Sequence, residues 1–336
     1  MISQRTVALA AGVSSATVSN VLNNPDLVAD QTRERVLRTI ADLGYVRNEA
    51  ARHLKAGRSR AVGFVAYDIA NPYFAEMLAP FEDEITKAGL HPLLMNSGQS
   101  ESRELANINL LQQLRVEGVV IAPLKAMSLE VANLRRTGTS VVVVDRIEPE
   151  TNFCSVACDD VAGGGLQARH LLETGHRHIA FVGGPLTRTQ VHGRLVGMQS
   201  ELVGERVVFE VIETQALKAS MGSEVARALA DRPVAKRPTA LACANDQVAL
   251  GVLQGFVSKG IRVPQDVAII GYDDIEYARA AAIPLSSVRQ PVREIGEVAV
   301  RMLLEEIDAH ATGAPHEHRS NLVTPELVVR SSTIRD

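Results

Sequence analysis

The spacing of hydrophobic residues changes near residue 60. Before it, apolar residues recur every three or four positions, as in Val18, Val21 and Leu22, and this spacing puts them on one face of a helix. "NNPD", from Asn23 to Asp26, then interrupts the pattern, as Pro and Asn pairs do in helices. The pattern predicts three short helices, over about 5–11, 15–22 and 30–43.

Polar residues and glycines mark the ends of these helices. Thr6 and Ser14 can cap the first and second helices through their hydroxyl groups. Gly12 supplies the turn between these two helices, and Gly44 is expected to end the third. A further segment, from Asn48 to Lys55, could form a fourth helix. It is so short and polar that it should order only when docked on something.

After residue 60, apolar runs alternate with helical patterns. The runs are almost uninterrupted, as in "GVVIAP" and "SVVVVD", which is typical of parallel strands buried on both faces. Eight such units are too many for one small sheet, so we predict an α/β core of two doubly wound parallel-sheet lobes. The predicted strands cover 61–67, 91–96, 118–123, 140–145, 178–184, 206–212, 239–245 and 266–274.

These patterns divide the chain into an all-α helix-turn-helix head and a larger core. The head is expected over 1–46, followed by a hinge helix and linker over 47–60. The core is expected over 61–336. Its first lobe should comprise about 61–160 and 291–320, and its second about 161–290 and 321–336.

Composition is that of an ordinary globular chain, but the charge is uneven. Of the 336 residues, 46% are hydrophobic and 22% charged, and the formal net charge is −4. Residues 1–60 nevertheless hold nine Arg or Lys against five Asp or Glu. A basic head on an acidic body is typical of a DNA-binding module attached to another domain. The sequence shows no signal peptide and no apolar run of roughly 18 residues, so we expect a cytoplasmic protein without a membrane segment.

Several predicted strands end in polar residues that could line one cleft. In open parallel sheets, ligands bind at the carboxyl ends of the strands. This rule would gather five residues around a single cleft: Asp145, Arg188, His192, Asn245 and Asp273.

Metal and nucleotide sites are not expected from the sequence. Cys154 and Cys158 lack a second ligand pair, and His316 with His318 would make an incomplete site, so we expect idle thiols and a polar loop. The glycines of "VAGGG" do not follow the dinucleotide-binding spacing and more simply allow close helix packing. No cofactor is therefore predicted.

The motifs together resemble the lactose-repressor/galactose-repressor family of bacterial transcription regulators over nearly the whole chain. In the head they are "VALAAGVSSATVSNVLNNP" and "TRERVLRTIADLGYVRNEAARHLKAGRS". In the core they are "NPYFAE", "TGHRHIAFVGGP", "ANDQVALG", "VPQDVAIIGYDDI", "SVRQP" and "PELVVR". The resemblance implies a periplasmic-binding-protein-like core.

For the head, the resemblance implies that the second helix enters the major groove and that a hinge helix inserts Leu54 into the minor groove. Many relatives have an Arg at the position of Asn20, which reaches less far toward a base. Phosphate contacts and the Leu54 wedge should therefore supply much of the affinity. Relatives also have a capping Ser where this chain has Ala29. The implied DNA-binding residues are Thr6, Ser14, Ser15, Ala16, Thr17, Ser19, Asn20, Asn48, Ala51, Arg52, Leu54 and Lys55.

For the core, the resemblance implies a small effector held between the lobes. Some sugar-responsive relatives have an Arg where this chain has His192, whereas an Arg of the purine repressor matches Arg188. Arg188 with His192 would suit a carboxylate or phosphate on the ligand. The implied effector-binding residues are Asn71, Tyr73, Phe74, Asp145, Arg188, His192, Asn245, Asp273 and Gln290.

The leading hypothesis is an effector-responsive repressor that binds a pseudo-palindromic operator as a homodimer. The effector would be a sugar, sugar acid, sugar phosphate or similar polar metabolite. One alternative is an α/β enzyme using Asp145, His192 and Asp273 as acid, base and orienting group, although no nucleophile elbow or phosphate loop supports it. Another alternative is a protein that only binds a ligand and whose head contacts a second protein.

Overall fold

The computed structural model describes residues 2–45, 59–125, 129–147 and 153–334. The chain divides into two compact units, Met1–Ser59 and Arg60–Asp336. The expected hinge helix over 48–55 lies outside the described residues. Among the described helices, none combines the length and the apolar character that crossing a membrane requires.

The described part of the first unit contains three α-helices, as the hydrophobic spacing predicts. A single 3₁₀ turn, η1, follows the second helix, and the apolar faces meet in one small core around Val7, Val18 and Val36, all fully buried. The helices are α1 (Gln4–Ala11), α2 (Ser15–Asn23), η1 (Pro25–Leu27) and α3 (Asp30–Leu43).

The helix ends in the head match the expected residues except at the start of α1. Ser3, and not Thr6, is the N-cap, because its hydroxyl accepts a hydrogen bond from the Thr6 amide at 3.2 Å. The Ser3 amide in turn donates to the Thr6 hydroxyl. Thr6 is thus the third residue of a capping box. Ser14 caps α2 as predicted, and Ala29 leaves α3 without a side-chain cap.

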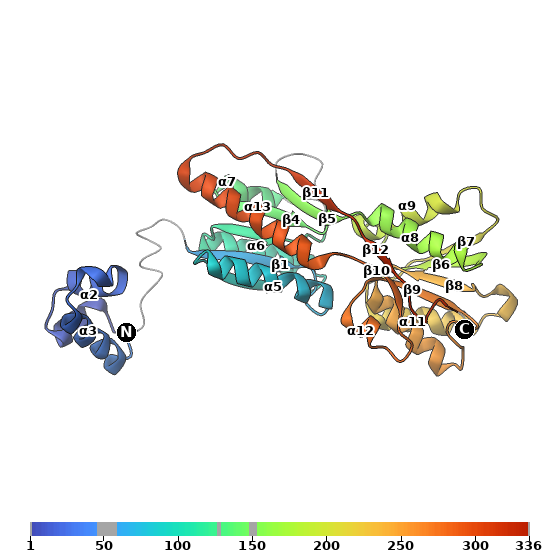
Figure 1. Cartoon of the computed structure of the whole chain (residues 1–336), viewed down its shortest axis with the longest axis horizontal. Helices are drawn as coiled ribbons and strands as arrows, with labels where there is room; N and C mark the ends of the chain where they lie inside the picture. Colours follow the sequence, from blue (N-terminus) through green and yellow to red (C-terminus); the bar gives the residue numbers. More distant parts are fainter. Residues whose placement is uncertain (1, 46–58, 126–128, 148–152, 335–336) are drawn as a thin grey trace. The chain divides into compact units, whose positions relative to one another are not determined.

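The second unit contains two six-stranded sheets, each forming a separate lobe (Figure 1). In the first lobe the strand order is β11-β5-β4-β3-β1-β2, and all neighbours are parallel. Helices α5 and α13 pack on one face and α6 and α7 on the other. The strands are β1 (Ala61–Ala66), β2 (His91–Asn96), β3 (Gly118–Ile121), β4 (Ser140–Val144), β5 (Cys154–Cys158) and β11 (Ser320–Val323). The helices are α5 (Pro72–Lys87), α6 (Glu101–Leu114), α7 (Leu129–Arg136) and α13 (Val292–Thr312).

The second lobe repeats this arrangement with the order β12-β10-β9-β8-β6-β7. Only the pair β10–β12 is antiparallel among the described strands of this sheet. Helices α8 and α9 cover one face and α10 and α11 the other. The strands are β6 (His178–Val182), β7 (Val208–Ile212), β8 (Ala240–Cys243), β9 (Ala268–Asp273), β10 (Ser286–Arg289) and β12 (Glu326–Val328). The helices are α8 (Asp160–Glu173), α9 (Thr189–Leu202), α10 (Ala219–Ala230), η2 (Val234–Lys236), α11 (Asp246–Ser258) and α12 (Glu276–Arg279).

The chain passes between the lobes after β5, after β10 and after β11. The first two passages fall where the sequence places them. The third comes a few residues later than the expected change at residue 320, because β11 pairs with β5 of the first sheet through Val323. The eight predicted strands are confirmed within a few residues. Strands β5, β10, β11 and β12 were not predicted.

The glycines of "VAGGG" allow two helices of the second lobe to touch along their backbones, as expected. A Cβ at Gly164 on α8 would lie 1.9 Å from the carbonyl oxygen of Arg194 on α9. The contact is reciprocal, since a Cβ at Gly197 would lie 1.8 Å from the carbonyl oxygen of Val161. This close packing fixes the side of α9 that faces the cleft between the lobes.

Candidate functional site

The cleft between the lobes is built from the carboxyl ends of strands and the first turns of the helices that follow. Asp145 comes directly after β4, and Asp273 is the last residue of β9. Both have a positive φ, 67° and 106°, which is an unfavourable backbone conformation for a non-glycine residue and is common at functional sites. Asn71 and Asn245 are the N-caps of α5 and α11.

Eight of the nine residues expected at the effector site line this cleft. The space left between their side chains is only about 30 Å³, close to the volume of one water molecule. Their side chains therefore leave little free space in the cleft. The eight are Asn71, Tyr73, Phe74, Asp145, Arg188, Asn245, Asp273 and Gln290.

His192 does not line the cleft, and its expected place there was wrong. It is exposed on α9, whereas Arg194, two residues further on, is buried and lines the cleft. Residues two apart on a helix point about 200° apart, so both cannot face the same side. The acid–base set of Asp145, His192 and Asp273, considered for an enzyme, is consequently not assembled.

Arg188 is the least satisfied group of the cleft. Its side chain reaches across from the second lobe, and its guanidinium carbon lies 3.4 Å from the centre of the Tyr67 ring. The residue is only 8% exposed, and its Nε and Nη1 atoms have no hydrogen-bond partner. Burial lowers the pKa of Arg188, while the charge of Asp145 opposes this change. A buried cation with unused donors is suited to an anionic or acceptor-rich ligand group.

Arg194 is, by contrast, fully engaged by the protein. Its Nε donates to Asp160 at 2.8 Å, its Nη1 lies 3.8 Å from Asp273, and its guanidinium stacks 3.6 Å from the centre of the Tyr272 ring. These contacts connect α9 to the first residue of α8 and to the last residue of β9.

Asp145 and Asp273 are buried carboxyl groups that the cleft holds in place. Gln190 donates to Oδ2 of Asp145 at 2.7 Å, and Tyr73 donates to its Oδ1 at 3.4 Å. Burial, aided by the charge of Asp160, raises the pKa of Asp145 to about 7. Gln290 donates to Asp273 at 2.7 Å, and burial raises the pKa of this carboxyl group as well.

Three side chains donate hydrogen bonds that join the two lobes across the cleft. Gln190 of α9 reaches Asp145 of the first lobe, and Asn71 of the first lobe donates to Asp273 of the second at 3.3 Å. Gln247 of α11 donates to the carbonyl oxygen of Ala70 at 2.9 Å. A ligand entering the cleft would compete for these groups.

The sequence analysis missed several lining residues, although signals for them exist. Tyr67 and Asp68 follow β1 directly, and the strand-end rule that found Asp145 would have found them. Gln190 and Arg194 are one helical turn apart on the inward face of α9, which the helical period could have identified. The missed lining residues are Tyr67, Asp68, Gln99, Gln190, Arg194 and Gln247.

In the head, α2 presents a small polar surface. Ser15 and Ala16 are exposed, while Ser19 and Asn20 are half-buried. The Ser14 hydroxyl accepts from the Thr17 amide at 3.0 Å, so part of this surface already caps the helix. The remaining expected DNA contacts lie outside the described residues: Asn48, Ala51, Arg52, Leu54 and Lys55.

Comparison with known proteins decides between the alternatives. Residues 5–48 match the family of bacterial regulatory proteins called the lacI family, and residues 168–333 match the periplasmic binding protein-like domain. The HTH-type transcriptional repressor PurR of Haemophilus influenzae is 32% identical over 328 residues, covering 97% of both chains. PurR of Vibrio cholerae is 32% identical over 335 residues, covering 98% of this chain and 97% of the relative.

This chain belongs to the lacI family of bacterial regulatory proteins. The structure agrees along its length. A lac repressor dimer bound to operator and the anti-inducer ONPF matches with a TM-score of 0.82 and 26% identity over 99% of both chains. A LacI family regulator from Silicibacter pomeroyi matches with a TM-score of 0.85 and 25% identity over 100% of both chains. The protein is therefore a DNA-binding, effector-responsive transcription regulator with a helical head and a two-lobed ligand-binding core.

Proposed function

We propose that this protein represses transcription under the control of a small polar metabolite that binds between the lobes and presents an acidic or acceptor-rich group to Arg188. The observation that carries the proposal is the buried Arg188 guanidinium with two unpartnered nitrogen atoms. A carboxylate or phosphate group of the ligand would accept hydrogen bonds from these two donors.

The remaining cleft groups favour a ligand rich in hydroxyl groups as well as an acidic group. Asp145 and Asp273 accept hydrogen bonds, and Asn71, Asn245 and Gln290 can donate or accept them. Tyr73 and Phe74 supply an apolar wall, with their rings packed edge to face. Sugar acids and sugar phosphates combine these features, and a neutral sugar would leave Arg188 unsatisfied. We place Arg188, and not His192, at the ligand's charged end.

Ligand binding would act through the lobe–lobe contacts. The free space is small, about 30 Å³, so a sugar-sized ligand would exchange the bonds of Gln190, Asn71 and Gln247 across the cleft for bonds to itself. A ligand that binds the opened and closed arrangements with different affinity shifts the balance between them. Coupling between effector and operator binding then amounts to about 5- to 150-fold in affinity.

At the operator, we propose a homodimer on a pseudo-palindrome. The similar lac repressor structure, a dimer bound to operator, supports this arrangement. Ser15, Ala16 and Asn20 of α2 are the base-facing candidates. Ser14 and Thr17 would position the helix, and Leu54 would act as the minor-groove wedge. The proposal includes a cytoplasmic location, association with the nucleoid when bound to DNA, and no catalytic activity. A family made up of bacterial regulators supports it.

A thermal-shift screen of the full chain tests the ligand class. Neutral sugars, sugar acids, sugar phosphates and purines are compared on the wild type, Arg188→Gln and the control Arg206→Gln, which replaces an exposed arginine before β7. We expect an acidic ligand to stabilise the wild type and the control, and to bind Arg188→Gln at least about tenfold more weakly. Equal binding by wild type and Arg188→Gln would contradict the proposed role of Arg188.

A further inference from the structure

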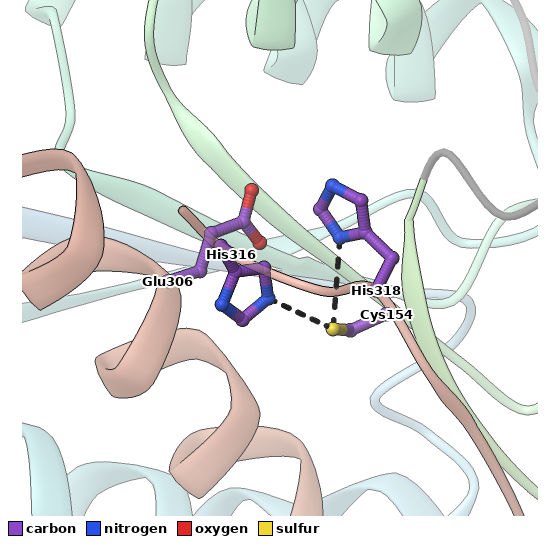
Figure 2. A group of neighbouring side chains, drawn as sticks. All are labelled: Cys154, Glu306, His316 and His318. Atoms are coloured by element: carbon purple, nitrogen blue, oxygen red, sulfur yellow. Dashed lines mark hydrogen bonds between the residues drawn. The ribbon is translucent and has the colours of Figure 1, made fainter. Parts of the chain in front are cut away.

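A second cluster of chemically active side chains lies in the first lobe, away from the cleft (Figure 2). Cys154 is the first residue of β5, and Glu306 lies on α13. His316 and His318 lie on the extended segment between α13 and β11. One candidate ligand atom from each of the four side chains lies within 4.8 Å of all the others. The sequence led us to expect a polar loop with an incomplete set of ligands, and the fold places a thiol and a carboxylate beside the two histidines.

The distances within the cluster suit a tetrahedral metal. Cys154 Sγ lies 3.3 Å from Nε2 of His316 and 3.7 Å from Nδ1 of His318. In a tetrahedral zinc site, bond lengths of about 2.3 Å to sulfur and 2.0–2.1 Å to nitrogen place these atoms roughly 3.6 Å apart. The sulfur is therefore already spaced from each of the two nitrogen atoms as coordination requires.

Glu306 provides an independent indication of a missing partner. The residue is 1% exposed, and neither of its carboxylate oxygens accepts a hydrogen bond of good geometry in the described structure, although the Val141 amide and the charge of Arg135 lie nearby. Burying an unpartnered carboxylate is costly, and such groups normally pair with a cation or bind a metal. Figure 2 shows its carboxyl group beside the two imidazole rings.

The local chain geometry keeps the two histidines on one side. In an extended segment, residues two apart point to the same face, and Glu317 between them is exposed while both histidines are half-buried. Their rings contact edge to face with centres 4.9 Å apart. Cys154 is buried in the strand next to the one that this segment enters.

The site is separate from the effector cleft. Parallel strands have their amino ends at one edge of a sheet, and Cys154 begins β5 whereas Asp145 follows the carboxyl end of β4. The cluster is thus near the amino-end edge of the first sheet, the edge at which β1 also begins.

We propose that Cys154, Glu306, His316 and His318 form a binding site for one divalent transition metal ion of the zinc class. Thiolate and imidazole ligands select such metals over magnesium or calcium. The ion ties the segment between α13 and β11 to strand β5. When it binds, the Cys154 thiol releases its proton to solvent and sulfur forms a bond to the metal, while Glu306 contributes an ionised oxygen.

Arg135 of α7 competes with the metal. Its guanidinium donates to Nε2 of His318, which leaves the proton of the neutral ring on Nδ1. Metal binding at Nδ1 requires that proton to be transferred to Nε2 and Arg135 to move away. Replacing Arg135 with Gln, whose carbonyl oxygen can accept from Nε2–H, removes the competing charge and should tighten metal binding.

Cobalt spectroscopy of the full chain tests the site. After dialysis against a chelator, the wild type is titrated with Co²⁺, a spectroscopic substitute for Zn²⁺. We expect one ion per chain, with visible bands of tetrahedral cobalt and a near-ultraviolet thiolate-to-cobalt band, all displaced by Zn²⁺. Zn²⁺ should also raise the thermal midpoint, because it binds only the folded chain.

Matched variants distinguish this site from adventitious binding. Cys154→Ser should lose the thiolate band, and His318→Gln, which changes a half-buried side chain, should weaken binding by about tenfold or more. Cys158→Ser on the same strand and His310→Gln on α13 serve as controls and should bind like wild type. The proposal is overturned if no tetrahedral cobalt spectrum forms, or if the spectrum and affinity survive in both Cys154→Ser and His318→Gln. Either result leaves the effector experiments unaffected, because those depend on the cleft.

Discussion

Replacing Asp145 with Asn should change how the stability of the protein depends on pH. Asp145 is 8% exposed, and burial, aided by the charge of Asp160, raises its pKa to about 7 from 3.8. Asn has the same shape and can still accept the bond from Gln190, but it carries no charge at any pH. The substitution therefore removes the titration and keeps most of the packing.

The direction of the effect follows from proton linkage. A carboxyl group with a higher pKa in the folded state than in the unfolded state is protonated more readily when folded. Its stabilising contribution is full below about pH 4 and is lost as the pH rises through about 7. A shift of about three units amounts to at most about 4 kcal/mol. Between about pH 5 and pH 8, the wild type should lose roughly 2–3 kcal/mol that the variant does not lose.

Urea unfolding of the full chain at several pH values between about 5 and 8 measures this difference. The free energy of unfolding of Asp145→Asn should rise relative to wild type as the pH increases. Asp266→Asn is the control. Bonds from Arg262 lower the pKa of exposed Asp266 to about 2, so its contribution is lost only in stronger acid and shows no trend across this range. Parallel curves for wild type and Asp145→Asn would refute the reasoning.

Three further predictions concern the packing and the head. Gly164→Ala should destabilise the second lobe by about 1–3 kcal/mol in urea unfolding, because the new Cβ would meet the Arg194 carbonyl oxygen at 1.9 Å; an unchanged midpoint would show that α8 and α9 separate freely. Ser14→Ala should cost the head about 1 kcal/mol, measured by circular dichroism of the helical signal, by removing the bond to the Thr17 amide; the same loss with Ser15→Ala, which replaces an exposed residue that is not the N-cap, would show that the loss does not come from the cap. Leu54→Ala should weaken operator binding more than Ser15→Ala in a gel-shift titration, and the reverse ranking would contradict the wedge.

The fold was largely predictable because the central strands of both sheets are apolar and buried on both faces. The apolar run "SVVVVD" clearly predicts a strand. In β5, "CSVAC", and β10, "SSVR", small and polar residues interrupt the apolar pattern, so no strand was predicted there. Their burial comes from neighbouring strands and helices that a local pattern does not contain. Antiparallel β12 is only three residues long and depends on its pairing with β10.

A residue of the candidate sites could be predicted only where the local sequence around it was enough to show its position in the fold. Asp145 and Asp273 were found because each ends a clear strand. His192 was misplaced because the resemblance indicated the helix but did not show which of its faces points into the cleft. Arg194 lies on that face. The Cys154 cluster was missed because Cys154 is more than 150 positions from the other three members, and only the sheet topology brings β5 beside the segment before β11.

The central claim is that occupancy of the inter-lobe cleft controls operator binding. Fluorescence anisotropy tests it directly, with a labelled palindromic duplex selected from random DNA and titrated with protein at zero and saturating concentrations of the ligand found by thermal shift. The account predicts that the ligand changes the dissociation constant of the wild type by at least about fivefold, and that Arg188→Gln shows no change at the same ligand concentration. An operator affinity that is the same with and without ligand in the wild type would contradict it.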